Sequence, residues 1–195
     1  MKIAERSTTR RFTVSEYHQM GDVGIFDGQR VQLIGGEVVV MSPQNFRHGS
    51  GLEEIAEILT KAFGARFWVR TQQPLKLRGD SEPEPDVYVV KGARREHKKT
   101  PTTAVLVIEV SDTTLRLDRR KRSLYAKAGI ADFWLVNLRK NQLEVYRKPI
   151  PDDSQPFGAG YSQKTILVAG DVVSPLAKSE VKIHVANLIP PNFEE

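Results

Sequence analysis

The sequence predicts a mixed α/β domain in which helices pack on a central sheet. Runs of β-branched and aromatic residues typical of strands recur along the chain, and other segments carry apolar residues at helical spacing. This mixture in one small unit favours a sheet covered by helices over a helical bundle or a β-sandwich. The chain has 195 residues, 39% of them hydrophobic, which is enough for one well-packed domain and too little for two comfortable ones. We therefore expect residues 1–195 to form a single domain.

Two helices and several strands are expected in the N-terminal half. Residues 13–20 form the first predicted helix, because Thr13 and Glu16 have the spacing of a capping box. Residues 48–63 form the second, since their apolar side chains fall on one helical face. Strands are predicted as a hairpin around Gly35-Gly36 within 30–43, and then at 66–72, 74–79 and 82–90.

The C-terminal half is expected to continue the alternation. The apolar run 104–111 is the most buried-looking strand, and a helix follows at 117–128. The proline- and glycine-rich stretch 149–160 is typical of a loop. Further strands are predicted at 132–137, 142–147, 165–170 and 171–175.

Composition narrows the function classes. The chain has no cysteine, which excludes disulfides, thiolate zinc sites and cysteine nucleophiles and suits a reducing, cytoplasmic location. No segment approaches the roughly 20 apolar residues of a membrane helix, so we expect no membrane partner. The net charge of +5 permits a polyanionic partner but favours one only weakly.

A carboxylate stands within the most apolar strand, "AVLVIEVSD" at 104–112. Side chains alternate along a strand, so Glu109 shares a face with Val105 and Val107 and points into a packed layer. An unpaired charge in that layer is costly. Glu109 therefore needs a partner.

Two more charged residues stand near predicted core positions. Asp86 opens the strand "PDVYVV". Lys121 lies on the apolar face of the 117–128 helix, three residues before Leu124. An inward-pointing glutamate on the preceding strand is the nearest sequence candidate for its partner.

The residues alone leave two interpretations open. Glu109 and Lys121 form a buried ion pair that orients the helix on the sheet, with Asp86 near solvent at the strand entry. Alternatively, two carboxylates on neighbouring strands hold Mg²⁺ or Mn²⁺, and the lysine orients water and balances charge on a phosphodiester under attack.

The order of these residues resembles the PD-(D/E)XK nuclease superfamily, and more specifically its Uma-type restriction endonuclease family. The segments "QLIGGEVVVMSPQNFRHG", "EPDVYVV", "VLVIEVSDTTLRLDRRKRSLYAKAGIADFWLVN" and "LEVYR" carry the resemblance, which gives a domain core at about 13–183 between short tails. It implies a restriction-endonuclease-like fold, a central mixed sheet flanked by helices, with Asp86 and Glu109 as metal ligands. The superfamily lysine lies two residues after the second acid, where this chain has Ser111, but the family places it on the following helix, as Lys121.

This chain departs from the family pattern at three positions. The family usually has an acidic residue at Gln32, an aspartate at Gly35 and a proline at Asp112. The first two lie close to Glu37, an additional candidate for the site.

Other candidates each have a structural alternative. Glu37 is either an acidic ligand or an exposed strand residue, and His48 is either catalytic or a helix cap or surface residue. Asp118 either accepts a hydrogen bond from Lys121 or favours the helix N-terminus through the dipole. A basic cluster is either a solvated helix face or a set of phosphate contacts: Arg116, Arg119, Arg120 and Arg122.

Two functions follow from these alternatives. The first is a metal-dependent endonuclease that cleaves DNA, in which Asp86, Glu109 and Lys121 are catalytic and a homodimer would suit double-strand cleavage. The second is a non-catalytic nucleic-acid-binding or scaffold protein that retains the nuclease fold. The sequence contains no recognition helix or zinc finger that predicts a DNA target sequence.

Overall fold

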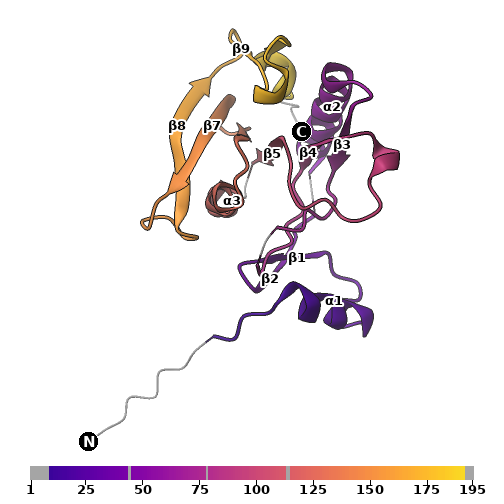
Figure 1. The fold of residues 1–195 in the computed structure, drawn as a ribbon. Helices are drawn as coiled ribbons and strands as arrows, with labels where there is room; N and C mark the ends of the chain where they lie inside the picture. Colours follow the sequence, from indigo (N-terminus) through magenta and orange to yellow (C-terminus); the bar gives the residue numbers. More distant parts are fainter. Residues whose placement is uncertain (1–8, 44, 78, 113–114, 192–195) are drawn as a thin grey trace, which may run out of the picture.

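A six-stranded mixed sheet forms the centre of the protein (Figure 1). The computed structural model describes residues 9–43, 45–77, 79–112 and 115–191, apart from the side chain of Arg116. In spatial order, the sheet consists of β3 (Phe67–Thr71), β4 (Val87–Lys91), β5 (Leu106–Ser111), β6 (Asp132–Asn137), β7 (Gln142–Pro151) and β8 (Ala159–Leu167).

The remaining elements surround this sheet. The helices are α1 (Val14–Asp22), α2 (Phe46–Phe63) and α3 (Leu115–Lys127), with 3₁₀ turns η1 (Arg94–Glu96), η2 (Leu176–Lys178) and η3 (Val185–Leu188). Two small antiparallel pairs are β1 (Val31–Ile34) with β2 (Glu37–Val40) and β9 (Val172–Val173) with β10 (Ile183–His184).

One strand pair of the central sheet is parallel. Strands β5 and β6 run in the same direction, whereas the other neighbours are antiparallel. Parallel neighbours need a crossover, and α3 provides it. This places α3 directly after the strand that carries Glu109, which makes the predicted contact between Glu109 and Lys121 possible.

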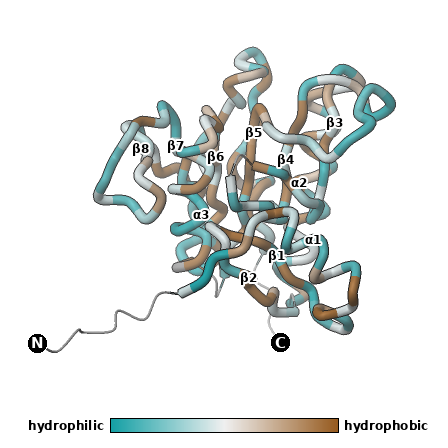
Figure 2. Tube along the Cα trace, turned by 60° about the horizontal axis from the view of Figure 1, so that its bottom comes forward, coloured by the Kyte–Doolittle hydropathy of each residue, from teal (hydrophilic) through white to brown (hydrophobic). Residues whose placement is uncertain are grey.

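Each face of the sheet has its own apolar core. Helix α2 covers one face with a stripe that ends in Leu59 and Phe63, packed on side chains that include Ile108 and Val110. Helix α3 and the β1–β2 hairpin cover the other face, where Val107 and Tyr125 are buried. Figure 2 shows brown, apolar residues along central strands such as β5 and largely teal residues in the outer turns. The mixed fold class predicted from the sequence is therefore confirmed.

Helix starts follow their capping residues. Thr13 and Glu16 form the predicted capping box of α1. Helix α2 begins two residues before the predicted start at His48, because the side chain of Asn45 accepts the backbone N–H of His48 and caps the helix. In the described residues, no helix is long and apolar enough to cross a membrane.

One predicted strand is wrong, and one predicted loop is too long. The described part of 74–79 forms no strand, and its buried Leu75 instead donates its backbone N–H to the carbonyl of Pro83. The predicted loop 149–160 is confirmed at 152–158 and wrong at both ends, since β7 extends to Pro151 and β8 starts at Ala159. Beyond Arg147, β7 pairs only with β8 and, in the described residues, has a free edge on its other side. Pro149 and Pro151 lie in this part of β7, where a strand tolerates residues that have no backbone N–H.

Candidate active site

Strand pairing brings Asp86 and Glu109 together. Val87 lies opposite Ile108 in the antiparallel β4–β5 pair, so the next position outward on β4 places Asp86 opposite Glu109. The Oδ2 atom of Asp86 accepts the backbone N–H of Val110 at 2.8 Å, which fixes this carboxylate against β5. Both side chains are buried, with residue exposures of 8% for Asp86 and 1% for Glu109.

Lys121 and Tyr125 reach Glu109 from α3. The Lys121 Nζ donates to Oε1 of Glu109 at 3.1 Å, and the Tyr125 hydroxyl donates to the same oxygen at 2.6 Å. These residues are four apart, so they lie on one face of the helix. The predicted pairing of Glu109 with Lys121 is therefore present, and Tyr125 completes it.

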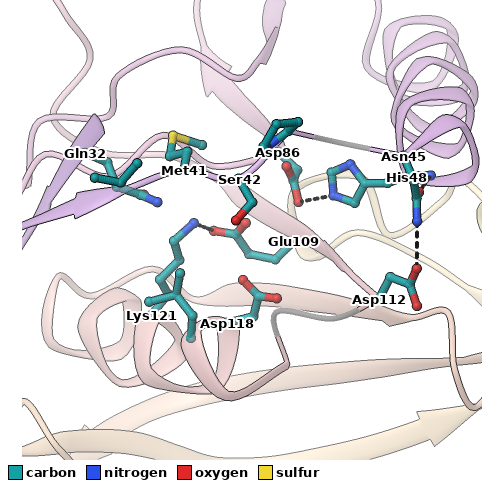
Figure 3. Close-up of a pocket in the computed structure, with 13 residues that line it drawn as sticks. Gln32, Met41, Ser42, Asn45, His48, Asp86, Glu109, Asp112, Asp118 and Lys121 are labelled. Carbon is teal, nitrogen blue, oxygen red and sulfur yellow. Dashed lines mark hydrogen bonds and ion pairs between the residues drawn. The ribbon is translucent and has the colours of Figure 1, made fainter. Parts of the chain in front are cut away.

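The acids and the lysine line one cavity of about 180 Å³ (Figure 3). Its volume corresponds to about six water molecules in the liquid, which is enough for an ion with part of its water shell or for one phosphate group. The lining residues come from the β1–β2 hairpin and the segment after it, the start of α2, the start of β4, the end of β5 and the first half of α3. They are Gln32, Val40, Met41, Ser42, Pro43, Asn45, His48, Asp86, Glu109, Asp112, Leu117, Asp118 and Lys121.

His48 enters the cavity from the first turn of α2. Its Nε2 lies 3.3 Å from Oδ2 of Asp86, and its buried Nδ1 has no hydrogen-bond partner among the described residues. Asn45, which caps α2, donates its amide to Asp112 at 2.9 Å across the cavity mouth. This bond joins the start of α2 to the end of β5.

The two buried carboxylates have opposite pKa shifts. Burial raises the pKa of Glu109 to about 8, against the opposing charge of Lys121. Burial also favours a higher pKa for Asp86, but the hydrogen bond from His48 and the charges of His48 and Lys121 outweigh it and hold the pKa below the ordinary value. Burial disfavours the charged form of Lys121, yet the negative charges around it, first that of Glu109, raise its pKa. The Lys121 ammonium therefore stays protonated at neutral pH.

The donor set fits a hard divalent cation. Within the described residues, the hydrogen bonds to these carboxylates reach Oδ2 of Asp86 and Oε1 of Glu109, which leaves one oxygen of each for a ligand. No group of three or more histidine or acidic side chains in the described residues is arranged to hold an ion. Mg²⁺ usually binds through one or two carboxylates plus waters and substrate phosphate, so two carboxylates at an open cavity suit it.

Several predicted site residues lie elsewhere. Glu37 is outside the cavity and forms ion pairs with Arg120 at 2.8 Å and Arg11 at 3.6 Å. Arg122 donates to Gln155, away from the cavity lining. Arg119 is 3.9 Å from the buried Glu144. The side chain of Arg116 lies outside the described residues.

Sequence reasoning did not include Tyr125 or Asn45 among the site candidates. Tyr125 follows Lys121 by four residues, which is a usable signal for a shared helix face. Asn45 precedes the predicted helix, and its contact with Asp112 depends on tertiary structure. Asp118 and His48, both candidates, do line the cavity.

Comparisons with known proteins agree with this architecture. The Uma2 family model, described as "Putative restriction endonuclease", matches residues 14–186. A solved structure from Anabaena variabilis, described as "a putative nuclease belonging to DUF820", superposes with a TM-score of 0.68 at 13% identity, over 91% of this chain and 97% of that chain. At that identity the likeness shows the fold alone.

A second structure is the type IIG restriction endonuclease BpuSI, with a TM-score of 0.39 and 14% identity, over 72% of this chain and 14% of that chain. No curated protein matches the sequence. Because the family match spans most of the chain, as the resemblance predicted, the protein belongs to the Uma2 family, "Putative restriction endonuclease".

Proposed function

We propose that this protein is a metal-dependent endonuclease that hydrolyses DNA phosphodiester bonds. The observation that carries the proposal is the convergence of Asp86, Glu109 and Lys121 on one cavity from two strands and a helix. Membership of the Uma2 family supports a nuclease, and the donor chemistry supports a divalent metal.

Asp86 and Glu109 would hold Mg²⁺ or Mn²⁺ through their free oxygens. When bound, the ion polarises the phosphate and makes a water more acidic. The residues of the chain have distinct tasks around it. Asp86, whose pKa is lowered chiefly by its contacts with His48 against the effect of burial, supplies a permanent negative charge. Glu109 supplies a second charge once its proton leaves.

Lys121 acts as a cation and donor in this proposal. Its raised pKa keeps it protonated, so it stabilises negative charge that develops on the phosphate and orients the attacking water. The superfamily resemblance implies cleavage in which water attacks the phosphorus and the 3′-oxygen leaves, so that the product carries a 5′-phosphate. The hydrogen bond to Glu109 keeps the Nζ atom beside the proposed metal site.

The test is cleavage of supercoiled plasmid by purified protein with Mg²⁺, Mn²⁺ or EDTA. The Asp86→Asn variant should fold and lose cleavage, whereas Asp22→Asn, at an exposed position at the end of α1, should cleave like the wild type. A folded Asp86→Asn variant with undiminished activity would contradict the proposal. Parallel assays with a single-stranded DNA and an RNA of the same sequence identify the nucleic acid.

The scaffold alternative has one observation in its favour. Glu109 already accepts bonds from Lys121 and Tyr125, and such a network holds α3 on the sheet without any substrate. Under this alternative the protein neither binds Mg²⁺ nor cleaves, and Lys121→Ala acts only by lowering the melting temperature because Glu109 loses its partner.

A further inference from the structure

Gln32 is a polar residue on a strand that is otherwise core. All four residues of β1 are buried, and Gln32 is 2% exposed. It shares a face of the hairpin with Ile34, which belongs to the apolar core under α3. A buried amide there costs stability unless its polar atoms are used.

The backbone fixes the orientation of the Gln32 amide. The N–H of Glu84 donates to Oε1 of Gln32 at 3.3 Å, and a backbone N–H can bond only to the oxygen end of an amide. The amide nitrogen must therefore point the other way. Gln32 lines the active-site cavity, and Figure 3 shows its nitrogen directed to the side of the cavity where the Lys121 ammonium lies.

The amide nitrogen of Gln32 is available as a hydrogen-bond donor. Among the described residues, Gln32 donates no hydrogen bond from Nε2, although its oxygen is held. Lys121 is the lysine of the cavity lining, and the acidic side chains of Asp86 and Glu109 lie beyond it. Gln32 and Lys121 thus place two donors at one end of the cavity, next to Glu109, one of the carboxylates that would hold the metal.

We propose that Gln32 binds the substrate, donating an amide N–H to a non-bridging oxygen of the scissile phosphate. The assignment rests on the proposed nuclease function and names one contact of the same site. A phosphate that binds the metal beside Lys121 would meet the Gln32 amide, the Lys121 ammonium and the metal from different directions. The contact would strengthen as charge builds on the phosphate oxygens.

Two substitutions separate this role from a structural one. Gln32→Glu keeps an oxygen for the Glu84 N–H but removes the donor and adds a negative charge facing the phosphate. Gln32→Leu removes the donor without adding charge. The control is Gln29→Glu, an exposed position three residues earlier. If Gln32→Leu fails to fold, the glutamate variant still provides the test.

Single-turnover cleavage of a short duplex and Mg²⁺ binding by calorimetry are the measurements. We expect Gln32→Leu to cleave about 10- to 100-fold more slowly and Gln32→Glu to be slower still, since loss of one transition-state donor has effects of this order or larger. Magnesium affinity should be unchanged in the leucine variant and equal or higher in the glutamate variant. Gln29→Glu should match the wild type in both assays.

A substrate with one phosphorothioate at the cleaved bond identifies the oxygen. The wild type should cleave one of the two diastereomers more slowly, because sulfur is a poorer hydrogen-bond acceptor than oxygen. In Gln32→Leu, which lacks the donor, the ratio of the two cleavage rates should be smaller. Wild-type cleavage rates in Gln32→Glu, or a parallel loss of Mg²⁺ binding and activity in both variants, overturn the assignment. If these variants match the wild type while Asp86→Asn is inert, only the Gln32 assignment fails; an inert wild type overturns both proposals.

Discussion

Metal binding at the proposed site should be coupled to the loss of a proton from Glu109. The pKa of Glu109 is raised to about 8 by burial, whereas a ligand to Mg²⁺ must be ionised. At pH 7 about ten molecules in eleven then carry the proton, so binding releases about 0.9 proton per ion. At pH 9 the release falls to about 0.1.

The same linkage sets how affinity depends on pH. Ionised Glu109 makes up about one part in a hundred at pH 6, one in eleven at pH 7 and nine in ten at pH 9. The apparent affinity for Mg²⁺ should therefore rise about ninefold from pH 6 to 7 and about tenfold from pH 7 to 9. Above pH 9 it should level off.

Calorimetric titration in buffers with different ionisation heats measures both quantities. Because His48 contacts Asp86 and also has a raised pKa, owing to Asp86 and despite burial, the His48→Gln variant separates its protons from those of Glu109. Glu54→Gln, at an exposed position on α2, is the matched control for Glu109→Gln, which should lose binding. A release below about 0.3 proton at pH 7, or constant affinity between pH 7 and 9, would refute the reasoning.

Three more outcomes follow from the same contacts. Because the folded pKa of Glu109 lies above its unfolded value of 4.5, the metal-free protein should lose stability relative to Glu109→Gln as pH rises from 4.5 to about 8; parallel melting temperatures that stay level would contradict this. Tyr125→Phe removes a bond that lowers the pKa of Glu109, so it should move the pH midpoint of Mg²⁺ binding upward and cost about 1–2 kcal/mol in chemical denaturation; an unmoved midpoint counts against it. Glu37→Gln breaks a partly exposed pair with Arg120 outside the cavity, so it should change stability by less than about 1 kcal/mol and leave plasmid cleavage intact, and a large loss of cleavage would return Glu37 to the site.

Local sequence rules were sufficient for the central residues of the site. Strand alternation placed Glu109 on an inner face, and helical spacing placed Lys121 on the apolar side of the following helix. A parallel β5–β6 crossover then brings the two together, which needs no information beyond the order of the elements. The buried pair at 3.1 Å agrees with that prediction.

Contacts that depend on long-range packing were not predictable in this way. The position of Gln32 in the cavity depends on how the hairpin lies on the sheet, and its orientation on a backbone N–H 52 residues away. The predicted loop at 149–160 was too long because prolines were treated as strand breakers, although a strand edge without a second neighbour tolerates them. Glu37 matched the family pattern, but its partner Arg120 comes from a distant helix.

The lysine and the carboxylates are held by different parts of the fold. Asp86 and Glu109 are fixed by strand pairing, whereas α3 is anchored to the hairpin of β7 and β8, where the Ser123 hydroxyl donates to the carbonyl of Ala159 at 2.7 Å. A small slide of α3 would move Lys121 and Tyr125, the two donors to Glu109, and would leave the bond between Asp86 and the Val110 N–H in place. Loosening the β7–β8 edge should therefore reduce turnover and also shift the pH midpoint of metal binding upward through Glu109, although no residue of that edge lines the cavity.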